Sequence, residues 1–194
     1  LKGLSTKMPM GIVGGSDYSK ISEQMRGEEV LNMFEYVFCE NGLVAYRKGK
    51  LLELNNISKY LGEEYLQKFI NFCLAYMSKI NLPLKRGTFI EYRNGMLNLS
   101  PIGRNCTQVE RDEFEAYDKI HEVRKKLVES LRSEFGMETL QFSIGMSTFS
   151  FRFIFLGGQI SIDVFPTGWN KSFCLKFLKD YQNIYFYGDK TYPT

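Results

Sequence analysis

Short apolar runs that end in glycine or polar residues lie near both ends of the chain, and this arrangement constrains the fold most. Three such runs are Met10–Val13, Tyr36–Cys39 and Ile184–Tyr187. Runs of this kind predict buried strands whose tips present polar groups at one edge of a sheet. The sequence therefore predicts an α/β core domain that is assembled from residues 1–51 and 171–194.

Between these ends, residues 52–170 have the pattern of an inserted α+β domain. We expect strands over residues 88–92, 140–144 and 159–165, and long helices over residues 62–80 and 107–135. The helices follow from apolar residues at three-to-four spacing, and the strands from short apolar or alternating runs. The pair Asn94-Gly95 is typical of a type I′ turn, so a hairpin is expected around it.

Arginines cluster at the start of the second long helix: Arg93, Arg104 and Arg111. Thr107 and Glu110 fit the capping box that opens a helix, so Arg104 precedes the helix and Arg111 lies in its first turns. Guanidinium groups and the free N–H groups of a helix start both favour an anion. The spacing indicates a pocket for a phosphorylated small molecule. The alternative is that these arginines are simply solvated, as most are.

Two polar residues share one face of the expected strand at residues 159–165. Ser161 and Asp163 are two positions apart, so their side chains point the same way. A hydroxyl and a carboxylate in this arrangement can hydrogen-bond sugar hydroxyls, although a solvated strand face is the alternative. The single histidine, His121, has no acidic or cysteine partner at ligand spacing, which favours a structural role.

Charge and cysteine usage narrow the function classes. The formal net charge is +3 and the basic residues are scattered, so neither nucleic acid nor an acidic membrane is expected as a partner. The four cysteines form no CxxC motif, and reduced thiols fit a cytoplasmic protein. No apolar run is long enough to span a membrane.

Five stretches of the sequence resemble eukaryotic phosphomannomutases of the haloacid dehalogenase superfamily. They are GIVGGSDYSKISEQ, YVFCENGLVAYRKGKLL, LPLKRGTFIEYRNGMLNLSPIGRNCTQVERDEF, GGQISIDVFPTGWNKSFCL and FYGDKTY, in that order over nearly the whole chain. The resemblance implies a haloacid dehalogenase-like (Rossmannoid) core, incomplete here, with a cap domain at residues 52–170 for substrate binding and homodimerisation. It also implies a cytoplasmic isomerase that interconverts mannose 6-phosphate and mannose 1-phosphate through an aspartyl-phosphate. That reaction supplies GDP-mannose for protein glycosylation.

The resemblance also implies roles for individual residues. The implied substrate-binding residues are Arg93, Arg104 and Arg111 for the phosphate, and Ser161 and Asp163 for the sugar. Lys171 would steady the aspartyl-phosphate, and Ser16 would hydrogen-bond the transferring phosphoryl group. Asp189 would belong to a loop that binds Mg²⁺. The implied cofactors are Mg²⁺ and a hexose 1,6-bisphosphate activator.

The chain departs from the family pattern in three places. It holds no DxDGT motif, which carries the nucleophilic aspartate upstream of Gly11 in the family, and it ends at Thr194, before the family's GGND loop. Residues 146–157 form a phenylalanine-rich insertion. We therefore expect the chain as given to lack mutase turnover. The alternatives are a non-catalytic sugar-phosphate-binding or dimerisation module, and a hexose-bisphosphate phosphatase.

Overall fold

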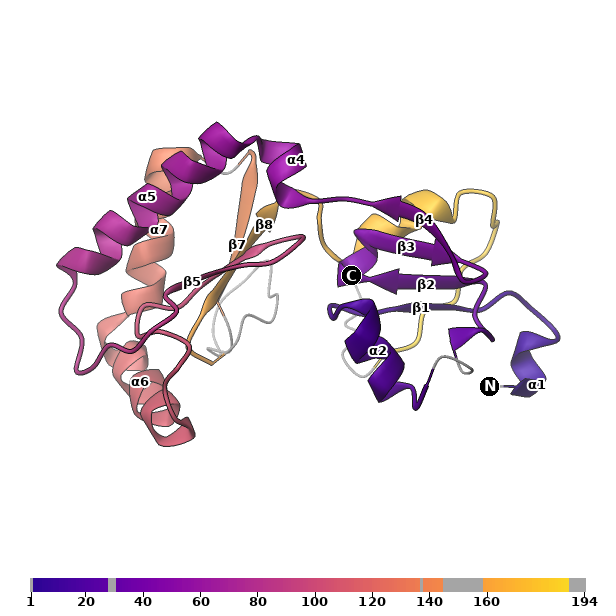
Figure 1. The fold of residues 1–194 in the computed structure, drawn as a ribbon, viewed down its shortest axis with the longest axis horizontal. Coiled ribbons are helices and arrows are strands. Elements are labelled where there is room, and N and C mark those ends of the chain that lie inside the picture. Colours follow the sequence, from indigo (N-terminus) through magenta and orange to yellow (C-terminus); the bar gives the residue numbers. More distant parts are fainter. Residues whose placement is uncertain (1, 28–30, 137, 145–158, 189–194) are drawn as a thin grey trace. The chain divides into compact units, whose positions relative to one another are not determined.

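The chain divides into two compact units in the computed structural model, which describes residues 2–27, 31–136, 138–144 and 159–188 (Figure 1). Unit 1 comprises Leu1–Glu53 and Asn170–Thr194, and unit 2 comprises Leu54–Trp169. Residues 146–157 and Asp189 lie outside the described residues. None of the described helices is long and apolar enough to cross a membrane.

Unit 1 contains a four-stranded sheet in the order β1-β2-β3-β4. Its strands are β1 (Gly11–Val13), β2 (Tyr36–Cys39), β3 (Val44–Arg47) and β4 (Lys50–Leu54). Its helices are α1 (Lys2–Ser5), α2 (Tyr18–Gln24), η1 (Glu40–Gly42) and η2 (Lys171–Phe177). β1 pairs parallel with β2, which requires the crossover that α2 provides, and β2 pairs antiparallel with β3.

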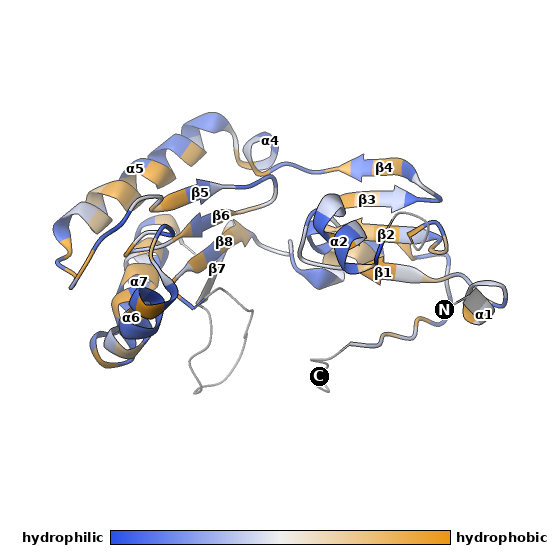
Figure 2. Ribbon diagram, turned by 60° about the horizontal axis from the view of Figure 1, so that its bottom comes forward, coloured by the Kyte–Doolittle hydropathy of each residue, from blue (hydrophilic) through white to orange (hydrophobic). Residues whose placement is uncertain are grey.

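Both faces of β2 are covered, which explains its uninterrupted apolar run. Val37 and Cys39 pack in a cluster with Ile21 of α2, whereas Tyr36 and Phe38 pack in a second cluster with Cys174 of η2. All of β2 is buried, as the sequence predicts. Figure 2 shows the hydropathy of these strands. β1 is less buried than expected: Gly11 is exposed, and Ile12 and Val13 are only partly buried. The reason is that β1 lies at the edge of the described sheet and has β2 as its one neighbour there.

The strand predicted at Ile184–Tyr187 is wrong. These residues have no regular secondary structure, and their exposed fractions run from 49% at Ile184 to 87% at Tyr187. An apolar run forms a strand only where a neighbour accepts and donates its ladder hydrogen bonds. Within the described part of the chain, this segment pairs with no strand.

Unit 2 contains an antiparallel four-stranded sheet in the order β5-β6-β8-β7. Its strands are β5 (Ile90–Tyr92), β6 (Leu97–Leu99), β7 (Leu140–Ile144) and β8 (Ile162–Pro166). Its helices are α4 (Ile57–Leu61), α5 (Glu63–Lys79), α6 (Gln108–His121) and α7 (Val123–Phe135). A mixed α/β fold is thus confirmed.

One face of this sheet packs against helices α5 and α7. The ring of Phe69 in α5 lies 5.0 Å from that of Phe135 in α7 and 6.3 Å from that of Phe142 in β7. Phe142 is in register with Val164 of β8, so Val164 belongs to the same face. Because side chains alternate along a strand, Asp163 belongs to the opposite face.

The single helix predicted from Thr107 to Phe135 is two helices, because the chain bends at Glu122. That residue has a left-handed backbone, with φ 53° and ψ 38°. The carboxylate of Asp118 accepts a hydrogen bond from the backbone N–H of Arg124 at 2.9 Å, which caps the second helix. His121 lies at the end of α6, where it is exposed and stacks on Tyr117.

The hairpin around Asn94 and Gly95 is confirmed, but its turn is not of type I′. A type I′ turn requires a positive φ at both central residues. Among the described residues, those with a positive φ do not include Asn94 or Gly95. Asn94 is instead held by contacts outside the hairpin. Its side chain donates to the carbonyl of Asn55 at 2.8 Å and accepts from the side chain of Asn56 at 2.9 Å.

Candidate functional site

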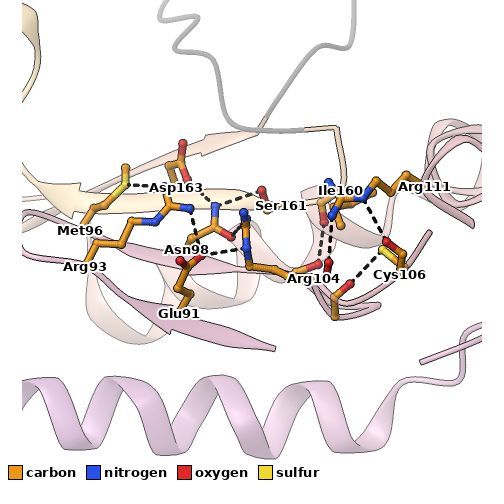
Figure 3. A network of polar contacts seen from close by, with 12 residues as sticks. Glu91, Arg93, Met96, Asn98, Arg104, Cys106, Arg111, Ile160, Ser161 and Asp163 are labelled. Carbon is orange, nitrogen blue, oxygen red and sulfur yellow. Dashed lines mark hydrogen bonds and ion pairs between the residues drawn. The ribbon is translucent and has the colours of Figure 1, made fainter. Parts of the chain in front are cut away.

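Polar residues form a row across the sheet of unit 2, on the face opposite α5 and α7 (Figure 3). The strand register places Glu91 of β5 opposite Asn98 of β6, and Asn98 opposite Asp163 of β8. Residues in register on one face are close enough for direct side-chain contact. The row therefore brings together groups that lie up to 72 positions apart in the sequence, from Glu91 to Asp163.

Glu91 joins two of the arginines that the sequence singles out. Its Oε2 accepts a hydrogen bond from Arg93 Nη2 at 2.9 Å and lies 2.8 Å from Arg104 Nε. The hydrogen bond from Arg93 holds the pKa of Glu91 below its ordinary value, and the charge of Arg104 acts in the same direction. One carboxylate oxygen therefore holds both guanidinium groups side by side.

Asn98 connects this pair to the two residues expected to bind the sugar. Its Nδ2 donates to Ser161 Oγ at 3.0 Å and to Asp163 Oδ1 at 2.6 Å, and its Oδ1 accepts from Arg104 Nη1 at 2.6 Å. Asn98 and Ser161 are buried, with 2% and 1% of their surface exposed. The side chains of Arg93, Arg104, Ser161 and Asp163, four of the five predicted substrate-binding residues, are thus joined through Glu91 and Asn98 by hydrogen bonds and an ion pair.

The backbone before Arg104 is fixed by a close crossing of two segments. Gly103 has φ +89°, and a Cβ atom there would lie 2.5 Å from the carbonyl oxygen of Gly87 and 2.6 Å from that of Arg86. The backbone N–H of Arg104 donates to the carbonyl of Thr88 at 3.0 Å. Only glycine fits this crossing, and it sets the direction in which Arg104 leaves the backbone.

Arg111 lies beside Arg104 at the start of α6. Its Nη2 donates to the backbone carbonyl of Arg104 at 2.8 Å and its Nε to that of Cys106 at 3.3 Å. The predicted capping box is confirmed: Thr107 and Glu110 each accept from the other's backbone N–H. A guanidinium at a capped helix start adds to the partial positive charge there.

The two residues expected to act in phosphoryl transfer belong to unit 1. The carbonyl of Ser16 accepts from the backbone N–H of Glu40 in η1 at 2.9 Å. Lys171 is the exposed first residue of η2, which packs against η1 through the contact of Cys174 with Gly42. Both residues therefore lie on segments that pack against η1. The arginines, Ser161 and Asp163 belong to unit 2.

Among the described residues, no three histidine, cysteine, aspartate or glutamate side chains gather where they could hold a metal ion. Asp189, the residue expected to belong to a Mg²⁺ loop, is outside that part of the chain.

Sequence reasoning missed Glu91 and Asn98. Glu91 looks like an ordinary solvated residue within the short strand 90–92, and Asn98 lies between two leucines. The signal that could have found them is alternation: each is the polar residue of a strand whose neighbours are apolar or aromatic. Alternation alone does not show that these residues lie together; that follows only from the pairing of β5, β6 and β8.

A family model described as eukaryotic phosphomannomutase matches residues 1–194. The chain belongs to the eukaryotic phosphomannomutase family. Phosphomannomutase 2 of Dictyostelium discoideum is 53% identical over 99% of this chain and 73% of its own length. The phosphomannomutase of Spinacia oleracea is 54% identical over 99% of this chain and 72% of its own length. The resemblance seen in the sequence is confirmed, and the relatives are named as enzymes of one kind.

Solved structures similar to this chain include two sugar-phosphate phosphatases or their relatives. A trehalose-6-phosphate phosphatase related protein matches 91% of this chain with 16% identity and a TM-score of 0.44. The Aspergillus fumigatus trehalose-6-phosphate phosphatase matches 92% of it with 18% identity and a TM-score of 0.47. The chain spans 59% and 55% of the lengths of these two proteins.

Burial of the Asp163 carboxyl in this network predicts a pH-dependent stability. Burial raises the pKa of Asp163 above its ordinary value of 3.8, although the hydrogen bond from Asn98 opposes this shift. A raised folded-state pKa means that ionisation disfavours the folded state. The associated loss of stability begins as the pH rises above 3.8 and is complete above the folded-state pKa.

Asp163→Asn removes this ionisable group and keeps a side-chain oxygen that can accept the hydrogen bond from Asn98. The variant should therefore become more stable than the parent as the pH rises from about 4 to about 7, with little difference at the lower pH. Denaturant unfolding across this range measures the difference. Asp112→Asn is the control, since hydrogen bonds from Gln159 and Gln108 lower the pKa of that exposed carboxyl, and its loss should not stabilise. A gain for Asp163→Asn that is equal at all pH values would contradict the prediction.

Proposed function

We propose that this chain binds hexose phosphates through Arg93, Arg104, Arg111, Ser161 and Asp163 and takes part in the phosphomannomutase reaction. That reaction interconverts mannose 6-phosphate and mannose 1-phosphate for GDP-mannose synthesis and protein glycosylation. The observation that carries the proposal is the network in which Asn98 joins Arg104 to Ser161 and Asp163. It supports a site with an anion-binding end, formed by the arginines, and a hydroxyl-binding end.

The network leaves the guanidinium groups able to bind a phosphate. Each guanidinium has five N–H donors. Arg93 uses Nη2 for Glu91 and Nη1 for the sulfur of Met96, whereas Arg104 uses Nη1 for Asn98 and pairs through Nε with Glu91. The remaining N–H groups suit a phosphate dianion, which accepts paired hydrogen bonds from this fork. At the other end, Ser161 Oγ and the Asp163 carboxylate are suited to orient the hydroxyl groups of a sugar ring.

The proposed chemistry assigns two roles to unit 1. The Ser16 hydroxyl would donate a hydrogen bond to the phosphoryl group in transfer, and the Lys171 ammonium would balance the negative charge that gathers around it. We further propose that the protein uses Mg²⁺ with Asp189 in its loop, that a hexose 1,6-bisphosphate primes it, and that it acts in the cytoplasm. Residues 1–51 and 171–194 would be its core, and residues 52–170 a cap through which a homodimer forms.

A thermal melt of the 194-residue chain with glucose 1,6-bisphosphate tests the binding part of the proposal. A ligand that binds only the folded state adds about 2.7 kcal/mol of stability at a hundredfold excess over its Kd. For a chain of this size, that raises the melting midpoint by roughly 5–10 °C. Glucose at the same concentration is the control and should leave the midpoint unchanged. No shift with the bisphosphate, or an equal shift with glucose, would refute a phosphate-binding site.

A turnover assay separates binding from catalysis. The sequence holds no DxDGT motif, so the purified chain should bind the bisphosphate without converting mannose 1-phosphate to mannose 6-phosphate. Coupled detection of mannose 6-phosphate measures this. Conversion by the purified chain would show that another residue serves as the phosphoryl acceptor. Release of inorganic phosphate from the bisphosphate would favour the phosphatase alternative.

A further inference from the structure

A buried ion pair lies outside the proposed binding network, at the bend between α6 and α7. Arg124 and Asp118 have 2% and 8% of their surfaces exposed, and Arg124 Nε donates to Asp118 Oδ2 at 2.7 Å. Buried charges are rare unless they are paired and hydrogen-bonded, and apolar residues would fill such a position at less cost in desolvation. We therefore asked which contacts the Asp118–Arg124 pair makes that apolar side chains could not make.

The first contact of the pair fixes the bend itself. Asp118 Oδ1 accepts from the backbone N–H of Arg124 at 2.9 Å, and the Asp118 carbonyl accepts from the backbone N–H of Glu122 at 2.8 Å. One aspartate thus ends α6 and caps the start of α7. Because α6 begins beside Arg104 and carries Arg111, the bend limits where the anion-binding end of the site is placed.

The second contact reaches the strand that carries the hydroxyl-binding end. Arg124 Nη1 donates to the backbone carbonyl of Ser161 at 3.4 Å. The ladder of β8 with β6 begins at Ile162, so the carbonyls just before it need other partners. Ser100 Oγ donates to the carbonyl of Ile160 at 3.3 Å, and Arg124 serves the carbonyl of Ser161.

We propose that Arg124, oriented by Asp118, is a positioning residue that holds Ser161 and Asp163 in place relative to the arginines at the start of α6. Its guanidinium joins the bend of the helices to the backbone of β8, and neither Arg124 nor Asp118 would touch the substrate. This inference rests on the proposed function, since it concerns the geometry of that binding site. A defect should therefore appear in ligand affinity and in local protection of β8.

Arg124→Lys tests the proposal, with Arg132→Lys as the matched control on the same helix. Lysine keeps the buried charge but has one nitrogen, whereas Arg124 uses Nε for Asp118 and Nη1 for Ser161. Calorimetric titration should show about tenfold weaker binding of glucose 1,6-bisphosphate, the effect of one hydrogen bond from a charged donor. The exposed Arg132 should tolerate the change with affinity unaltered.

Hydrogen exchange provides a readout that a general loss of stability would not reproduce. In Arg124→Lys, amides of residues 160–163 should exchange faster, while those of α5 should keep their parental rates. Unaltered affinity together with unaltered exchange at residues 160–163 overturns the proposal, as does acceleration spread equally over α5. If the parent chain itself fails to bind, the proposed function fails, and the exchange result alone decides the role of Arg124.

Asp118→Asn replaces Arg124→Lys if the lysine variant shows no cooperative melt. Asparagine keeps an oxygen for the backbone N–H of Arg124 and removes the charge that orients Nε. The same loss of affinity and the same local exchange are expected. Parental values for both would overturn the proposal.

Discussion

Replacing Gly103 with alanine is expected to lower the free energy of unfolding by about 3 kcal/mol or more. Two costs add at this position. The backbone has φ +89°, where an L side chain is strained, and the new Cβ would lie within 2.6 Å of the Arg86 and Gly87 carbonyl oxygens. Neither oxygen belongs to a flexible side chain, so the crossing of the two segments must open.

Gly136→Ala is the matched control for Gly103→Ala. Gly136 also has a positive φ, +70°, but no heavy atom of the described residues lies within 4 Å of a Cβ built there. It should therefore lose only the cost of the strained backbone, about 1–3 kcal/mol, and less than Gly103→Ala loses. Denaturant unfolding of both variants measures the difference. Equal losses would mean that the close crossing before Arg104 does not contribute.

Arg104→Met is expected to weaken binding of glucose 1,6-bisphosphate roughly 100-fold, the order expected when a charged, paired donor is lost. Arg104 contacts both Glu91 and Asn98, so its loss removes a phosphate donor and the link to the hydroxyl-binding end. Calorimetric titration well below the melting temperature measures the affinity.

The control for Arg104→Met is Arg132→Met, the same substitution at an exposed position on α7. It removes one positive charge from unit 2 without touching the network. If both variants lose affinity equally, the effect comes from net charge rather than from the site. If neither loses affinity, the phosphate does not bind at Arg104.

Local patterns predicted the parts of the fold whose partners are close in sequence or whose burial is complete. The run Tyr36–Cys39, the stripe of α5 and the capping box at Thr107 all behave as their sequences indicate. The capping box is formed by contacts within one helical turn, and the two apolar segments need only an apolar surface to pack against.

The wrong predictions concern features that depend on contacts which the local sequence pattern does not reveal. Apolar residues 184–187 were expected to form a strand, but a strand requires a neighbour, and no described strand pairs with them. The bend at Glu122 depends on the burial of the Asp118–Arg124 pair, which helical periodicity does not reveal. Glu91 and Asn98 gain their roles only through the order of the strands.

The single carboxylate oxygen of Glu91 has an entropic consequence for recognition. Free arginine side chains have many rotamers, and immobilising a long side chain on binding costs about 0.5–1.5 kcal/mol. Arg93 and Arg104 are already ordered by Glu91 in the folded chain, so that loss of freedom occurs on folding instead. An anion that reaches this sheet meets a preorganised pair of guanidinium groups, and its affinity is not reduced by their ordering.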